Sequence, residues 1–175
     1  MRWWWAFVIP FMLCLVCAGP GQATTPNELK VAVRVFDFLT VPPRGPTPLA
    51  VIFDGQNKAS LEDALAIQEG LKSGVSSAKA ELLPVLVDAR HLDEFPDLHV
   101  GVVAFGTGAY FDRILGYAIK NHTVTISSDP SCMQSGKCTV GIGSSPRVEV
   151  IINRAVAASC GIEFSEAFRM MVREF

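Results

Sequence analysis

The chain has 175 residues, of which 50% are hydrophobic and 18% are charged, and its formal net charge is −2. This length suits one domain, alone or with a targeting segment, and excludes a two-lobed receptor, because each lobe needs its own core of about 100 residues or more. The low, balanced charge gives no sign of a nucleic-acid-binding surface, and the apolar content excludes a disordered chain.

The N-terminus has the pattern of a secretory signal peptide. Arg2 supplies a positive charge, an uncharged apolar run follows, and Gly21-Gln22-Ala23 fits a cleavage site of the small-x-small kind. We therefore expect residues 1–23 to be a cleaved signal peptide and residues 24–175 to form a single domain. The alternative is a leader retained as an anchor, although the run is short for a membrane span and contains Pro10.

The middle of the chain alternates between apolar runs typical of buried strands and amphipathic segments typical of helices. Strands are expected at residues 48–53, 82–87, 100–105 and 122–126, and helices at residues 27–39, 60–72 and 109–119. Ser60 is expected to cap the second helix, with Asp63 three residues later. Because the strands are apolar throughout and separated by helices, they imply a parallel sheet covered on both faces.

The cysteine pattern agrees with export. Cys132 and Cys138 flank a short segment that contains Gly136, and in an oxidising compartment we expect them to form a disulfide. On the chain-entropy account so small a loop adds only about 2 kcal/mol, so the bridge would shape a loop and not hold the fold together. Cys160 is expected to be a small buried hydrophobic residue. No zinc site is expected, because the paired C-x2-C spacing is missing.

The last part of the chain predicts a hairpin and a short helix. Residues 139–142 and 147–152 flank a turn that contains Gly and Pro, which is typical of a hairpin. Asn153 can cap a short helix over residues 154–160, and Gly161 can end it.

The final segment is predicted to be one amphipathic helix. Its apolar residues follow helical spacing and are Phe164, Phe168, Met171, Val172 and Phe175. Glu166, Arg169 and Arg173 would lie on the opposite, exposed side. Together the elements predict a three-layer α/β sandwich with a mostly parallel sheet of flavodoxin-like character, completed by a C-terminal hairpin and helix.

Three segments of the chain resemble the YfiR-like family of periplasmic proteins. They are Val148-Glu149-Val150-Ile151-Ile152-Asn153 with Ala157-Ala158 and Cys160-Gly161-Ile162, Thr125-Ile126-Ser127 with Asp129-Pro130, and Lys30 to Phe38 running into Val41-Pro42. The resemblance covers most of residues 27–175 in the family's order. The chain departs from the family pattern at Gly136-Lys137, where the family has Gly-Gly, and at Val41-Pro42, where Trp-Pro is frequent.

The resemblance implies a non-enzymatic periplasmic protein that needs no cofactor. The best understood members restrain an inner-membrane diguanylate cyclase by contacting its periplasmic part. By this resemblance the partner would be the periplasmic part of an inner-membrane protein and not a nucleic acid, and the chain would lie peripheral to the membrane; homodimer formation stays open. Arg169 and Arg173 are candidates for meeting an acidic partner, with solvated charge as the alternative. The loop 132–138 is a candidate contact element, because a constrained loop is ordered at low cost.

A second hypothesis is a small-molecule binder that serves transport or sensing. Asp54 and Asp88 each end an apolar strand, at the edge where open α/β sheets bind ligands. They are candidates for a cation or an acid–base pair, and the alternative is that each begins a loop or caps a helix. Gly106, Thr107 and Gly108 lie between a strand and a helix, so their N–H groups are candidates for holding an anion, against a plain tight turn. These five residues form the predicted ligand crevice.

An enzyme is the third hypothesis. His91, His99 and His122 are scattered, and no Glu-x-x-His, Gly-x-Ser-x-Gly or Cys–His pattern occurs. No nucleophile, base and orienting group can be assembled, so we predict no catalytic and no metal-binding residues.

Overall fold

The structure is a computed structural model, and it describes residues 23–143 and 147–175. The predicted signal peptide, apart from Ala23, lies outside the described residues. The helices are α1 (Pro26–Val35), α2 (Lys58–Lys72), α3 (Phe111–Asn121), α4 (Pro130–Gln134), α5 (Arg154–Ser159) and α6 (Glu166–Arg169), with 3-10 helices η1 (Phe36–Phe38), η2 (Ala89–Glu94) and η3 (Gly108–Tyr110). The strands are β1 (Gly45–Phe53), β2 (Ala80–Asp88), β3 (Val100–Val103), β4 (Val124–Ser127), β5 (Val140–Gly143), β6 (Glu149–Ile152) and β7 (Arg173–Glu174).

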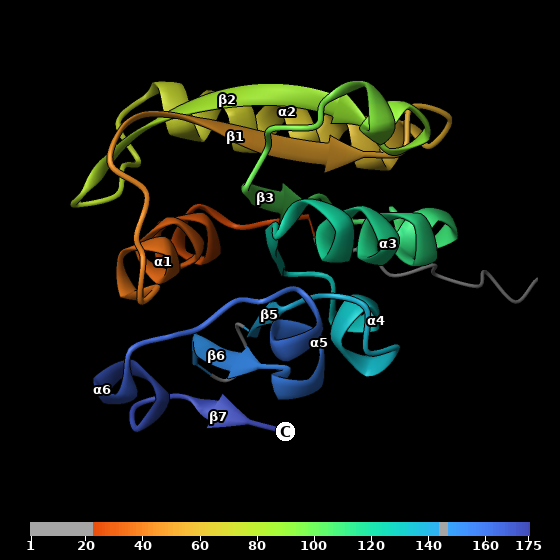
Figure 1. Cartoon of the computed structure of the whole chain (residues 1–175). Coiled ribbons are helices and arrows are strands. Elements are labelled where there is room, and N and C mark those ends of the chain that lie inside the picture. The colour runs from red at the N-terminus through yellow and green to blue at the C-terminus, as the bar shows by residue number, and fades with distance from the viewer. Residues whose placement is uncertain (1–22, 144–146) are drawn as a thin grey trace, which may run out of the picture.

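The strands form one seven-stranded sheet in the order β2-β1-β3-β4-β5-β6-β7. Figure 1 labels all of them except β4, from β2 at the top to β7 at the bottom. Strands β1 to β5 are parallel, β6 runs antiparallel to β5, and β7 pairs parallel to β6. The order 2-1-3-4-5 of the parallel part is that of flavodoxin-like folds, and the antiparallel β5–β6 pair is the predicted hairpin. The predicted fold class and the hairpin are therefore confirmed.

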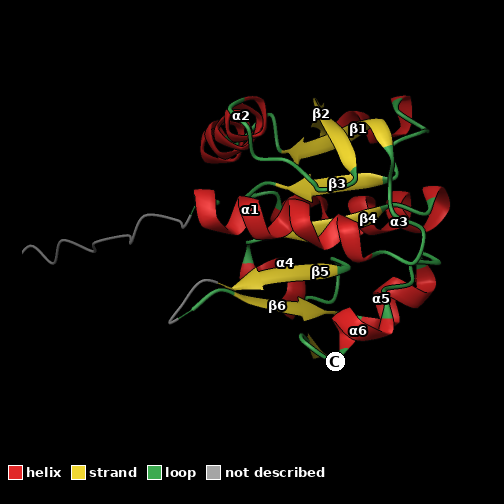
Figure 2. Ribbon diagram, turned by 90° about the vertical axis from the view of Figure 1, so that its left-hand side faces the viewer, coloured by secondary structure: helices red, strands yellow, loops and turns green. Residues whose placement is uncertain are grey.

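Helices cover both faces of the sheet and give three layers (Figure 2). On one face α1 and α2 pack on strand side chains such as Val51 and Ile126. On the other face η2, α3 and α4 pack on the alternate residues, among them Ile52 and Val103. This alternation explains the uninterrupted apolar strands of the sequence, since both sides of each central strand are buried.

Strand β2 is one outer edge of the sheet, and it contains Pro84. Proline has no backbone N–H to donate, so within sheets it is confined to edge strands, with its nitrogen on the outer side. The free edge of β2 therefore lacks a hydrogen-bond donor at its middle.

Two helix starts show how local sequence sets the boundaries. Thr25 and Glu28 form a reciprocal capping box at the start of α1, as helix-initiating residues do. In α2 the cap is Asn57, whose side chain accepts from the N–H of Ala59, and the expectation of Ser60 as the cap is wrong. The Ser60 hydroxyl instead accepts from the N–H of Asp54 and lies 3.1 Å from the Thr107 hydroxyl.

The largest departure from the sequence prediction is the final segment. Helix α6 ends at Arg169, and the chain then turns and adds β7 to the sheet instead of continuing as a helix. Phe164 and Phe168 are buried as predicted, and Phe168 stacks on Phe38 with ring centroids 4.5 Å apart. Hydrogen bonds to β6 replace those of a longer helix, because Phe175 donates its N–H to the carbonyl of Ile152. The correction is that Met171 and Phe175 are exposed, not buried.

The predicted disulfide between Cys132 and Cys138 is confirmed, and Cys160 is buried and unpaired as expected. Burial raises the pKa of the Cys160 thiol, which favours the unreactive protonated form. Both bridged cysteines are buried, and the loop that they close begins inside α4, at Cys132. Among residues 23–143 and 147–175, no helix is long and apolar enough to cross a membrane.

Candidate functional site

The carboxyl edge of the sheet brings the predicted crevice residues to one side of the molecule. Asp54 follows β1 and Asp88 ends β2, its register partner in β1 being Phe53. Gly106 and Thr107 follow β3, whose neighbour is β1. The strand order reverses between β1 and β3, the point where open α/β sheets bind ligands. Topology therefore gathers these residues as expected.

One carboxylate oxygen of Asp54 and both oxygens of Asp88 already have partners within the chain. An oxygen of Asp54 accepts from the N–H of Gln56 at 2.9 Å, so this side chain begins a turn. Asp88 caps η2 by accepting from the N–H of Arg90 at 3.0 Å, and it also pairs with the Arg90 guanidinium at 2.6 Å. A side chain at Gly55 would collide with an Asp88 carboxylate oxygen, so the space between these loops is filled. The geometry favours the turn and cap interpretation over a cation or acid–base pair.

The Gly106-Thr107-Gly108 turn is packed in the same way. The N–H of Gly106 donates to Asp129, and the Gly106 carbonyl accepts from the Asn57 side chain at 2.9 Å. Thr107 is fully buried, and its hydroxyl donates to the carbonyl of Ala104 at 2.6 Å. Gly106 adopts a positive φ of 75°, which glycine tolerates without strain. Because the N–H of Gly106 already donates to a carboxylate, the geometry favours a tight turn over an anion site.

Sequence reasoning gave Asp63 only a capping role, whereas the structure places it at the centre of this edge. Its carboxylate accepts from the N–H and the hydroxyl of Thr24 and from the N–H of Phe105 at 2.7 Å, and the residue is 2% exposed. These contacts fasten the start of the domain to the loop after β3, which is a structural role. Among the residues that the structure describes, no group of His, Cys, Asp and Glu is arranged to hold a metal ion.

The Asp88–Arg90 pair predicts a pH dependence of stability. The pKa of Asp88 is lowered to about 2, chiefly because the Arg90 side chain donates hydrogen bonds to its carboxylate. With its pKa lowered in the folded state, this group stabilises the fold above about pH 4, the unfolded value, and the contribution is lost as the pH falls towards 2. Arg90→Gln should lower the free energy of unfolding at pH 7 by about 1 kcal/mol, since the pair is partly exposed and screened.

Urea denaturation at pH 7, at pH 4 and near pH 2 checks this expectation. The wild-type protein should lose more stability between pH 4 and the lowest pH than the Arg90→Gln variant does. Equal losses in the two proteins would show that the pair does not carry this dependence.

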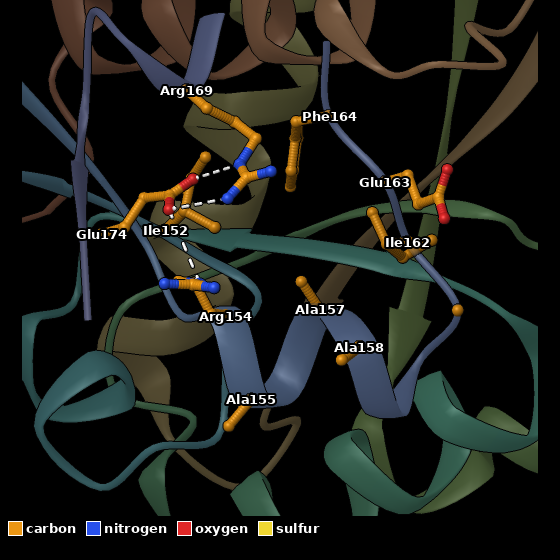
Figure 3. A pocket seen from close by; sticks show the side chains of 11 residues that line it. Ile152, Arg154, Ala155, Ala157, Ala158, Ile162, Glu163, Phe164, Arg169 and Glu174 are labelled. Atoms are coloured by element: carbon orange, nitrogen blue, oxygen red, sulfur yellow. Dashed lines mark hydrogen bonds and ion pairs between the residues drawn. The ribbon is translucent and has the colours of Figure 1, made fainter. Parts of the chain in front are cut away.

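A cavity of about 750 Å³ lies at the opposite end of the sheet order, beside β6 and β7 (Figure 3). Its apolar lining comes from β6, α5 and the segment before α6, and comprises Ile152, Ala157, Ile162 and Phe164. Its charged residues are Arg154, Glu163, Arg169 and Glu174. Figure 3 shows Glu163 on the far side of the apolar residues from Arg154 and Glu174. The cavity thus has two arginines and a glutamate at one end, an apolar middle, and a single glutamate beyond the other end.

Glu174 holds the two arginines at one end of this cavity. Its carboxylate accepts from the Nε of Arg169 at 2.6 Å and from Nη2 at 3.2 Å, and it lies 3.6 Å from the Nε of Arg154. Hydrogen bonding from Arg169 lowers the pKa of Glu174, so the carboxylate is charged at neutral pH. Arg169 therefore bonds to Glu174 through two nitrogens, whereas Arg154 makes a longer contact through one nitrogen.

Three exposed apolar residues are sequence neighbours of the cavity residues Arg169 and Glu174. Met170, Met171 and Phe175 are 83%, 68% and 60% exposed. Charged residues that form ion pairs flank them in the sequence, since Arg169 pairs with Glu174 and Arg173 pairs with Glu149. We call Arg169, Met170, Met171, Arg173 and Phe175 the C-terminal surface. The predicted partner residues Arg169 and Arg173 both belong to it, although each already pairs with a glutamate.

The three histidines do not converge on any cavity described above. His91 pairs with Glu94, His99 contacts the carbonyl of Asn121, and His122 contacts the carbonyl of Cys160. Sequence reasoning missed Arg154, Glu163 and Glu174 because they come from separate elements with no motif spacing. The adjacent methionines Met170 and Met171 are a sequence feature that could have indicated this region. They would be recognised as exposed only if the last helix were predicted to end at Arg169.

Comparison with known proteins supports the fold alone. No family model matches the chain, and no curated protein is similar enough to be matched. Among solved structures, a conserved domain protein from Vibrio cholerae O1 biovar El Tor is 9% identical with a TM-score of 0.57, and the match covers 85% of this chain and 59% of that one. The ABC domain in complex with L-Trp from Streptococcus pneumoniae is 11% identical with a TM-score of 0.57, and the match covers 83% of this chain and 59% of that one. The chain therefore spans less than two thirds of each neighbour and shares their α/β architecture.

Proposed function

We propose that this protein is a non-enzymatic periplasmic regulatory protein that works by contact with another protein, and that the C-terminal surface makes this contact. The observation that carries the proposal is the exposure of Met170, Met171 and Phe175 in one short segment. Exposed apolar side chains that lie together and are rimmed by charged residues mark sites of protein contact. Methionine suits such a surface, because its flexible side chain adapts to a partner.

The resemblance to the YfiR-like family supports the compartment and the kind of partner. On that basis the partner is the periplasmic part of an inner-membrane signalling protein such as a diguanylate cyclase. The disulfide between Cys132 and Cys138 supports an oxidising compartment, since such bridges persist outside the cytosol.

The test is affinity capture of the protein from its own cell envelope, with identification and quantification of what binds. The double variant Met170→Asp, Met171→Asp should capture at least tenfold less partner than the wild type does, because each new charge would have to be buried in the contact. Leu83→Asp is the matched control, since Leu83 is 43% exposed and lies on β2 at the other edge of the sheet. Equal capture by both variants and the wild type would overturn the assignment of this surface.

A small-molecule-binding protein that serves transport or sensing is the second candidate. One observation favours it, namely that a structural neighbour with the same architecture is described in complex with L-Trp. The place for such a ligand would be the edge between β1 and β3, near Asn57 and Gly106. This candidate replaces the first if the double methionine variant keeps its partner while Asn57→Ala loses a small molecule that binds the wild type.

A further inference from the structure

We infer that the cavity of Figure 3 is a peptide groove that binds a short segment of the partner with an acidic residue at one end, apolar residues in the middle and a basic residue at the other end. This inference rests on the proposed function and adds the chemistry of the partner. It uses the part of the molecule that adjoins the C-terminal surface, since Arg169 belongs to both.

The acid-binding end already holds a carboxylate of this chain. Arg169 grips Glu174 with two nitrogens, at 2.6 and 3.2 Å, in the paired geometry by which guanidinium groups recognise carboxylates. Arg154 comes from α5 and reaches Glu174 only through Nε at 3.6 Å. Its side chain is 66% exposed, so its outer nitrogens are available to a second carboxylate. Arg154 is therefore the anchor for an incoming acidic residue, and Arg169 with Glu174 forms a fixed wall beside it.

The middle of the groove is apolar and firmly supported. Ile152, Ala157 and Phe164 are buried residues of the main core, and Ile162 packs against that core. An apolar side chain placed on this floor would cover surface whose position is fixed by the sheet. The gain would come chiefly from the peptide's own apolar side chain leaving water, because Ile152, Ala157 and Phe164 are already buried.

The exposed Glu163 lies just beyond the other end of the groove, across the apolar floor from Arg154, and Figure 3 shows its carboxylate directed outward from the floor. A lysine or arginine of the partner would be favoured there, and an acidic residue would be disfavoured. The order of charges along the groove therefore selects the orientation of the bound segment, as complementary charges do in protein interfaces.

The exposure of the charged lining favours a segment of a protein over a small molecule. Small-molecule sites bury most of the ligand surface, whereas the walls here are themselves open to water, as the 66% exposure of Arg154 and the 45% exposure of Arg169 show. The sheet also ends at β7 beside the groove, and the outer side of an edge strand offers backbone groups to an extended segment.

The experiment measures binding of fluorescein-labelled peptides to the residue 24–175 domain by fluorescence anisotropy. The peptides are acetylated and amidated to remove terminal charges, and carry Glu and Lys separated by two, three or four residues of Leu and Phe. At least one spacing should bind, and changing its Glu to Gln should weaken binding at least tenfold. A peptide with Glu and Lys exchanged should bind more weakly, because its Lys would then lie near Arg154 and its Glu near Glu163, and like charges repel.

Arg154→Gln is the test variant, and Arg113→Gln is the matched control. Arg113 also pairs with one carboxylate, that of Asp93 at 2.7 Å, and is 44% exposed, but it lies on α3. Arg154→Gln should weaken binding of the Glu peptide at least tenfold and that of the Gln peptide less than twofold, whereas Arg113→Gln should change neither.

The results separate this inference from the proposed function. The inference is overturned if no peptide binds, if binding ignores the exchange of Glu and Lys, or if Arg154→Gln acts equally on both peptides. The proposed function would survive any of these results if the captured partner still depended on Met170 and Met171. If instead the peptides bind as expected but the methionine variant keeps its partner, the groove stands and the contact surface must be redrawn around it.

Discussion

Replacing Phe36 with alanine should lower the free energy of unfolding by about 4 kcal/mol. Phe36 is 0% exposed and lies in η1, directly after α1, within the larger core cluster that joins α1 and α2 to the sheet. Removing the ring loses its apolar contacts and leaves a cavity that the surrounding strands cannot close, because they are fixed by the sheet. Urea unfolding followed by far-UV circular dichroism measures the change.

Phe175→Ala is the matched control for this substitution. It removes the same ring from a residue that is 60% exposed, so the free energy of unfolding should change by no more than about 0.5 kcal/mol. A loss below about 1.5 kcal/mol for Phe36→Ala, or equal losses for the two variants, would contradict the packing described for α1.

Replacing Asp37 with alanine should cost about 3 kcal/mol of folding stability. This buried carboxylate accepts from the N–H groups of Ala78 and Lys79, at 3.0 and 3.2 Å, and from the hydroxyl of Ser77. It thereby ties η1 to the start of β2, about 40 positions later in the sequence. Alanine would leave the N–H of Ala78 and the hydroxyl of Ser77 without their acceptor, whereas the N–H of Lys79 would keep the Ser77 hydroxyl oxygen at 3.1 Å. The two unfilled donors account for most of the cost.

Two comparisons make the Asp37 result decisive. Asp37→Asn keeps one acceptor oxygen and should cost less than the alanine variant. Asp93→Ala removes a carboxylate that is 62% exposed and pairs with Arg113, and should cost no more than about 1 kcal/mol. If Asp37→Ala were as mild as Asp93→Ala, the contacts to residues 77–79 would contribute little to the fold.

The central sheet is well predicted from the sequence, because burial of a strand on both faces requires a continuous run of apolar residues. A strand that is covered by helices on each side must be apolar at every position, and Leu49 to Ile52 show this in the chain and in the structure. The cap at Asn153 is also predictable, since the side chain that starts α5 bonds to an N–H only three residues away, that of Val156.

The last helix could not be predicted because distant contacts override its local pattern. Phe164, Phe168 and Phe175 keep helical spacing, yet the free side of β6 offers hydrogen bonds that hold Phe175 in an extended segment. The ion pair between Arg169 and Glu174, five residues apart, does not match the spacing of neighbours on a helix. Only the position of β6 in space makes the extended arrangement favourable.

The crevice residues illustrate the opposite limit, in which position is predictable and chemistry is not. Topology alone places Asp54 and Asp88 at one edge, but whether a carboxylate stays open to a ligand depends on the loop after it. Here Gln56 bonds to one oxygen of Asp54 and Arg90 bonds to both oxygens of Asp88, through a turn and a cap that span two residues each.

The proline in β2 has a consequence for how copies of this protein could associate. Two sheets that join edge to edge need matching backbone donors and acceptors along both strands, and at Pro84 the outer strand has no N–H donor. The β7 side is therefore the better edge for such a join. Assembly through β7 would close at a pair of copies, and head-to-tail polymerisation through β2 is disfavoured.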